Sequence, residues 1–223
     1  MDTSGDGLPN VIAYLVVLAL FVQIGIRLLR ASGRPRRFPV FALVTTIVIG
    51  LPSLLQYVWP AITTALERNP ELTLAHGQWW RVLTALLAQD GGLAGAIFNL
   101  VVVAGVTLLG EWILGSWLAL VLFLVPSIVL NLLAILFWNA SGGGSSFASD
   151  GLLMSMCGLA LVTLPDVLAK ILAGITVLIG VALVAFLNDA HGVAILLGAV
   201  LGVLFALPRL RTTETRLAPS GSG

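Results

Sequence analysis

Apolar residues are gathered along this chain into seven long runs, which polar or glycine-rich stretches separate. A helix needs about 20 residues to cross the ~30 Å hydrocarbon core of a bilayer, and backbone polar groups in lipid must be satisfied within the segment itself. The pattern therefore predicts membrane-spanning helices. We expect these spans at 10–29, 38–59, 92–114, 117–138, 150–168, 169–187 and 190–208.

The composition agrees with a chain that has lipid as part of its solvent. Of the 223 residues, 59% are hydrophobic and 9% are charged, so a soluble globular form would expose large apolar patches. The expected fold class is all-α, a polytopic membrane helical bundle. The single cysteine, Cys157, excludes an intrachain disulfide, and the lipid bilayer is the first expected partner.

Basic residues lie mostly on one side of the predicted bundle. The positive-inside rule places the basic loop 30–37 in the cytoplasm, and alternation of the spans then gives nine basic residues inside and two, Arg68 and Arg81, outside. We therefore expect a protein of a bacterial-type plasma (inner) membrane, with its N-terminus outside and its C-terminus cytoplasmic. The expected divisions are an N-terminal helix with its basic loop (1–37), a six-helix core (38–208) and a disordered cytoplasmic tail (209–223).

Two of the connections between spans differ from the others. The connection from Pro60 to Gly91 is long, of mixed polarity and contains the pair Trp79-Trp80. Paired tryptophans favour the headgroup level of a membrane, so we expect short helices in the interface. The connection from Asn139 to Ser149 is rich in Gly and Ser, which indicates a loop that enters the following helix.

Few ionisable residues fall within or near the predicted spans, and such residues are functional candidates because a charge in lipid is costly. The candidates are Glu111, Asp150, Asp166, Asp189 and His191. Asparagine and serine side chains within the spans can equally hold helices together through hydrogen bonds. With two histidines and no paired cysteines, we expect neither a metal site nor a cofactor.

Four short motifs follow one another along residues 38 to 208. They are Gly77-Gln78-Trp79-Trp80-Arg81-Val82-Leu83-Thr84, Phe98-Asn99, Gly110-Glu111 with Gly115-Ser116, and Ala190-His191 followed by Gly198 and Gly202. In this order they resemble the first outer loop, the two ends of the second helix and the last helix of rhomboid intramembrane proteases. The resemblance implies a rhomboid-like six-helix core, to which the helix at 10–29 is an addition. It implies structural roles for Trp79, Trp80, Arg81, Glu111, Gly151, Gly158 and Gly198.

Rhomboids cleave peptide bonds within the membrane by a Ser–His dyad, in which the His activates the weakly nucleophilic serine. In that family the serine lies in Gly-x-Ser-Gly at the start of one helix, and the His lies on a later helix. Backbone amides with His and Asn side chains form the oxyanion hole. The resemblance implies that His191 is the base and that Asn99 is an oxyanion donor.

The chain departs from the family pattern at two places. When Gly151 and Gly158 are aligned with the two family glycines that follow the nucleophile, Asp150 takes the nucleophile position. Gly95 stands where the family has the oxyanion His, so one donor worth about 3–4 kcal/mol of barrier is missing. The pair Asp150 and His191 can instead lock two helices together or form a pH-sensitive element.

Three functions stay open on these residues. The first is a rhomboid-like pseudoprotease that binds transmembrane segments of client proteins without cutting them. The second is an active intramembrane serine protease that uses Ser149 with His191, which a Ser149 hydroxyl within about 3.2 Å of the His191 ring would support. The third is a small proton- or ion-coupled transporter with Glu111, Asp150 and His191 along its path. No nucleic acid partner is expected.

Overall fold

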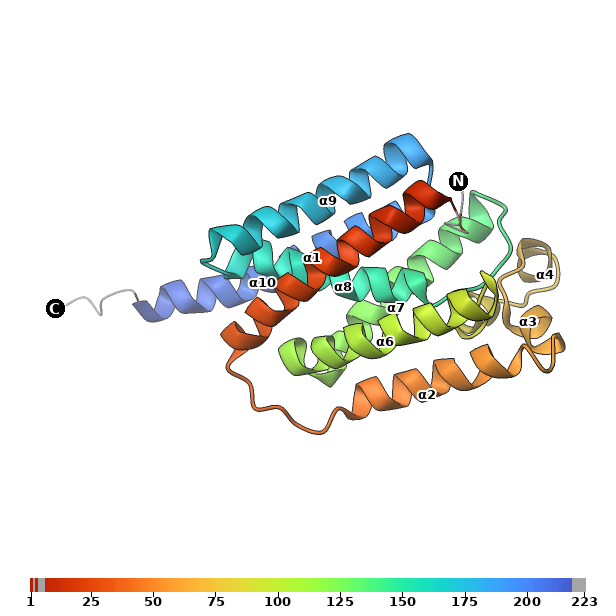
Figure 1. Ribbon diagram of the computed structural model, residues 1–223, viewed down its shortest axis with the longest axis horizontal. Helices are drawn as coiled ribbons and strands as arrows, with labels where there is room; N and C mark the ends of the chain where they lie inside the picture. Colours follow the sequence, from red (N-terminus) through yellow and green to blue (C-terminus); the bar gives the residue numbers. More distant parts are fainter. Residues whose placement is uncertain (2, 4–6, 218–223) are drawn as a thin grey trace.

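The computed structural model describes residues 1, 3 and 7–217, with the side chains of 207–217 excepted. Within this part of the chain, seven long helices form a bundle and four short helical segments gather at one end of it (Figure 1). The long helices are α1 (Leu8–Ser32), α2 (Val40–Leu55), α6 (Gly92–Leu114), α7 (Ser116–Leu136), α8 (Ser146–Thr163), α9 (Val167–Leu187) and α10 (Ala190–Leu217). The short ones are α3 (Ala61–Leu66), α4 (Pro70–Leu74), α5 (Arg81–Thr84) and the 3₁₀ turn η1 (Ala85–Leu87).

Each predicted span overlaps one long helix, which confirms the all-α fold class and the multi-pass bundle. Over the described residues, five helices are long and apolar enough to cross a membrane, namely α1, α6, α7, α8 and α9. The helix α2 and the 190–206 portion of α10 are apolar but shorter. The main difference lies at α8, which begins at Ser146 and not at 150.

The end of the chain differs from the expected disordered tail. The helix α10 continues to Leu217, so the backbone is helical over much of the stretch that we assigned to a tail from 209 onward. Leu, Arg and Glu in this stretch favour helix, and a helix already formed by the preceding span can be extended without a new nucleus. Residues 218–223 of the predicted tail lie outside the described residues.

The helix α8 is the centre of the bundle. Its residues 147–149 and 151–160 are all buried, and it contacts α1, α6, α7, α9 and α10. A helix that is buried on every side needs small residues where its neighbours come closest. Gly151 is the small residue where α8 comes closest to α7, because a Cβ at this position would collide with the ring of Pro126.

Glycines bring α8 and α10 into backbone contact. A Cβ on Gly198 would collide with the carbonyl oxygen of Gly151, and one on Gly202 with that of Ser155. Gly158 of α8 faces the carbonyl of Ala199 in the same way. Since residue numbers rise together on both helices, the two run in the same direction, and their N-terminal ends lie side by side.

The helix α1 is an integral part of the bundle. It crosses in front of α8, between α9 and α6 (Figure 1), and buries Phe21, Ile24 and Leu28 in the main apolar core. Gly25 lets it approach Leu109 of α6. The peripheral long helix is instead α2, which lies on the outer side of α6 (Figure 1).

The connection from 60 to 91 forms short helices, as predicted, and it holds the loop that leads into α8. The backbone of Arg68 exchanges hydrogen bonds of 2.9 and 3.1 Å with that of Gly142. The buried Arg68 guanidinium donates to Asn131 Oδ1 (2.9 Å) and to the Ala140 carbonyl (3.0 Å). The charged Arg68 side chain therefore fixes the conformation of loop 139–145.

Glu111 and Arg81 both make structural contacts. The Glu111 carboxylate accepts hydrogen bonds from the backbone amides of Phe41 and Ala42 and from the Ser116 hydroxyl, so it caps the N-terminus of α2. At the opposite end of the bundle, Arg81 donates to the carbonyls of Thr64 and Glu67.

We expect Gly202→Ala to lower the free energy of unfolding by about 1–3 kcal/mol, the usual cost of overpacking. The new Cβ would meet backbone atoms of Ser155, which cannot move away as a flexible side chain can. Thermal unfolding in detergent measures the change. Gly105→Ala is the matched control, because open space surrounds Gly105. Equal stability of the two variants would contradict the close contact.

Candidate functional site

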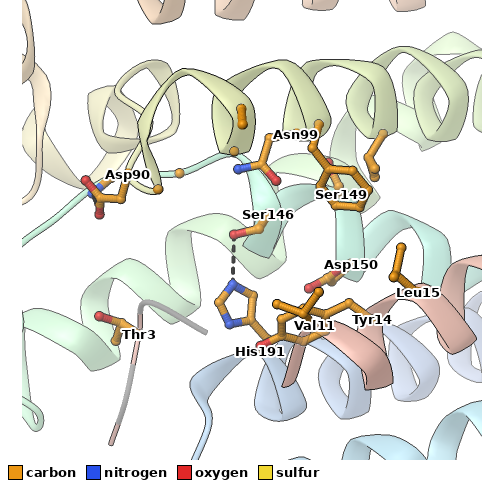
Figure 2. Close-up of a pocket in the computed structure, with 17 residues that line it drawn as sticks. Thr3, Val11, Tyr14, Leu15, Asp90, Asn99, Ser146, Ser149, Asp150 and His191 are labelled. Carbon is orange, nitrogen blue, oxygen red and sulfur yellow. Dashed lines mark hydrogen bonds between the residues drawn. The ribbon is translucent and has the colours of Figure 1, made fainter. Parts of the chain in front are cut away.

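A cavity of about 450 Å³ lies between α1 and α6, at the end of the bundle where α8 and α10 begin. Val11 and Leu15 of α1 and Phe98 of α6 contribute an apolar wall, and all three side chains are 41–49% exposed. The opposite wall carries polar groups of α8 and α10 (Figure 2). The cavity thus joins an apolar opening to a polar floor.

Ser146 and His191 meet on this floor. Ser146 Oγ lies 2.9 Å from His191 Nε2 (Figure 2), and His191 Nδ1 lies 2.8 Å from Asp189 Oδ1. A carboxylate can only accept, so it favours the tautomer with the proton on Nδ1. Nε2 is then left to accept the Ser146 hydroxyl proton, which is the geometry of a serine nucleophile with an oriented base.

The turn between α9 and α10 sets the relation of Asp189 to His191. The helix α9 ends at Asn188, whose left-handed conformation (φ 52°) reverses the chain. Asp189 Oδ1 then accepts the backbone N–H of His191 at 2.9 Å as well as its ring. The same oxygen therefore caps the start of α10 and orients the imidazole.

The second oxygen of Asp189 is held by α1. Asp189 Oδ2 accepts a hydrogen bond of 2.7 Å from Asn10 Nδ2 and another from the Tyr14 hydroxyl. Burial raises the pKa of the Asp189 carboxyl, but the hydrogen bonds from His191 and Tyr14 outweigh it and hold the pKa below its usual value. Asp189 is therefore an ionised partner for His191.

Two aromatic rings contact the His191 side chain. The Tyr14 ring centroid lies 5.1 Å and the Phe147 centroid 4.9 Å from that of the imidazole. His191 is only 5% exposed. Its orientation is thus fixed by two ring contacts in addition to its hydrogen bonds.

Ser146 owes its position to the loop before it. The Gly143 amide donates to Asp90 Oδ2 at 2.8 Å, and there is no room for a side chain on Gly143 beside Ala88. The preceding Ser145 accepts a hydrogen bond from Gln89 at 3.1 Å. Ser146 therefore becomes the first residue of α8, where its hydroxyl can face the cavity.

Donors for a developing oxyanion lie next to Ser146. The first backbone N–H groups of α8 have no partner within their own helix and carry its positive dipole end. Asn99 lines the cavity near Ser146 (Figure 2), and its Nδ2 donates to Gln89 Oε1 at 2.9 Å, which leaves a second N–H. Gly95 also lines the cavity but has no side chain to donate.

Neither residue expected at the nucleophile position is hydrogen-bonded to His191. Ser149 lines the cavity, but it is buried and its hydroxyl has no hydrogen-bond partner among the described residues. Asp150 also lines the cavity and is near enough for its charge to act on His191, but the hydrogen bonds and the ion pair of His191 are to Ser146 and Asp189. The hydrogen-bonded pair expected for Asp150 and His191 is therefore formed by Asp189 and His191.

The sequence does contain a signal for Ser146. Gly144-Ser145-Ser146 supplies the Gly-x-Ser part of the family motif, with Phe147 in place of its final Gly. The alignment on Gly151 and Gly158 concealed it, because these glycines serve contacts with α7 and α10. Asp189, two residues before the base, carried no family signal.

In comparisons with known proteins, no family model, no curated protein and no solved structure matches the chain. The functional argument therefore depends on the site itself. Over the described residues, no group of three His, Cys, Asp or Glu side chains is placed to hold a metal ion.

We expect Ser149→Ala to leave stability unchanged or to raise it by up to about 1 kcal/mol, because it removes a buried hydroxyl without a partner. Ser155→Ala is the matched control on the same helix. Its hydroxyl donates to the Gly151 carbonyl at 2.8 Å, so its removal should lower stability. Thermal unfolding of both variants in detergent measures the difference in stability. A larger loss of stability for Ser149→Ala than for Ser155→Ala would contradict the view that the Ser149 hydroxyl has no hydrogen-bond partner.

Proposed function

We propose that the protein is a rhomboid-like intramembrane serine protease, with Ser146 as the nucleophile, His191 as the general base and Asp189 as the group that orients it. The observation that carries the proposal is the hydrogen-bonded series from Ser146 Oγ through both His191 nitrogens to Asp189. It lies on the floor of a cavity large enough to admit part of a substrate chain. Ser146 thus takes the role of nucleophile, which the motif resemblance had placed at Ser149 or Asp150.

The reaction is an acyl transfer. Ser146 Oγ attacks the scissile carbonyl carbon while His191 Nε2 takes the hydroxyl proton, and Asp189 stabilises the imidazolium that forms. The oxyanion faces the first amides of α8 and the side chain of Asn99. His191 then gives its proton to the leaving amine. Water, deprotonated by the same imidazole, attacks the acyl carbonyl carbon and releases Ser146.

The proposed substrates are transmembrane segments of client proteins. Val11, Leu15 and Phe98 are exposed at the mouth between α1 and α6, on the sides of helices that lipid would cover. A substrate that already lies in the bilayer reaches Ser146 through this mouth without first crossing water. The motif resemblance over 38–208 supports the same class of substrate.

A pseudoprotease that holds client helices without cutting them is the second candidate. It is favoured by Gly95, which removes one oxyanion donor, since a single such donor is worth roughly 10²–10³ in rate. The transporter hypothesis has less support. Glu111 is engaged by the amides of α2, at the end of the bundle away from the cavity, and is not among the residues that line it.

Labelling with a fluorophosphonate probe separates these candidates. We expect the purified protein in detergent to be labelled, Ser146→Ala to be unlabelled and His191→Ala to be labelled roughly 10³-fold more slowly or worse. Ser149→Ala is the matched control and should be labelled at the parent rate. A folded parent protein that resists the probe would favour the pseudoprotease, and labelling that persists in Ser146→Ala would contradict the assignment of the nucleophile.

We also propose that the cavity lies on the outer side of a bacterial-type plasma membrane, with the N-terminus outside and the C-terminus cytoplasmic. The basic loop 33–37 lies at the other end of the bundle, where α1 ends and α9 begins (Figure 1). Basic residues favour the cytoplasmic side.

Two cysteine substitutions test this orientation. His76 and Pro35 are exposed at opposite ends of the bundle, whereas the native Cys157 is buried. We expect His76→Cys to react with a membrane-impermeant maleimide in intact bacterial cells, and Pro35→Cys to react only after permeabilisation. The reverse pattern would overturn the orientation.

A further inference from the structure

We propose that Asn10 and Tyr14 are positioning residues of the active site, so that α1 is a working part of the catalytic apparatus. This inference rests on the proposed function. It goes beyond it because the motif resemblance covers only 38–208 and assigns no role to the first helix. The contacts of Asp189 carry the proposal.

The Asp189 carboxylate depends on α1 for half of its hydrogen bonds. Its Oδ1 is occupied by the backbone and ring nitrogens of His191, whereas its Oδ2 is occupied by Asn10 and Tyr14. The residue is fully buried. A buried carboxylate with one oxygen left unpaired is costly, so loss of the α1 donors would favour rotation of the carboxylate away from His191.

Tyr14 has a second contact with the same site. Its ring lies against the His191 imidazole, while its hydroxyl reaches Asp189. One side chain therefore constrains both the base and the group that orients the base. Tyr14→Phe separates the two contributions, because it keeps the ring and removes the hydroxyl.

The helix α1 has further contacts with the bundle besides those of Asn10 and Tyr14. Farther along the helix, Phe21, Ile24 and Leu28 are buried in the core, and Arg27 Nε pairs with Asp166 Oδ2 at 2.8 Å. A substitution at Asn10 or Tyr14 should therefore change the site without releasing the helix. This separation makes the role of the two residues measurable.

The test is a double-mutant cycle on the rate at which the fluorophosphonate probe labels Ser146. We expect Tyr14→Phe and Asn10→Ala each to slow labelling about tenfold, the change that corresponds to one hydrogen bond. In an Asp189→Ala background, neither substitution should slow labelling further, because nothing remains to be positioned. Ile12→Ala, on the same turn of α1 but 53% exposed, should be labelled at the parent rate.

The outcomes distinguish the inference from the proposed function. A parent protein that is not labelled overturns the proposed function and this inference with it. A labelled parent whose Tyr14→Phe and Asn10→Ala variants keep the full rate overturns the inference alone, as does an equal slowing in both backgrounds, which would indicate a purely structural role. If Asp189→Ala does not fold, as judged by thermal unfolding, Asp189→Leu provides a background with a branched side chain that cannot accept hydrogen bonds.

Discussion

The close approach of the α8 and α10 backbones is the constraint on which the rest of the structure depends. Gly158, Gly198 and Gly202 permit it, and without a large hydrophobic driving force between helices in lipid, such close contact is a main source of stability. Because the two helices run in the same direction, their first turns lie together. That arrangement, and not any local motif, brings Ser146 to within 2.9 Å of His191.

The polar groups near this contact are connected to one another across several elements. Gln56, the residue after α2, exchanges hydrogen bonds with the backbone of Gln89, and the Gln89 side chain contacts both Ser145 and Asn99. A buried polar group in lipid has no water as a hydrogen-bond partner, so partners of this kind within the protein are required for folding. The same partners hold the loop before α8 and thereby aim the Ser146 hydroxyl.

The sequence was sufficient for the helices but not for the site. Runs of apolar residues are distinct, so all seven long helices were predicted, with the start of α8 the least accurate because a Gly- and Ser-rich stretch does not define where a helix begins. His191 and Asn99 were found through motif resemblance. Ser146 was missed because Gly151 and Gly158 were read as motif glycines. Asp189 was named as an ionisable candidate, but its contact with Tyr14 was not predicted, because it joins residues 175 apart in sequence, which no local pattern reveals.

The contact of α1 with Asp189 also bears on when the site can exist. Asn10 and Tyr14 lie on α1, whereas Asp189 and His191 lie at the start of α10, after the other six long helices have been made. The hydrogen-bonded series is therefore incomplete until α10 has been inserted and has packed against α1. During synthesis, Ser146 would thus reach the membrane before its histidine partner.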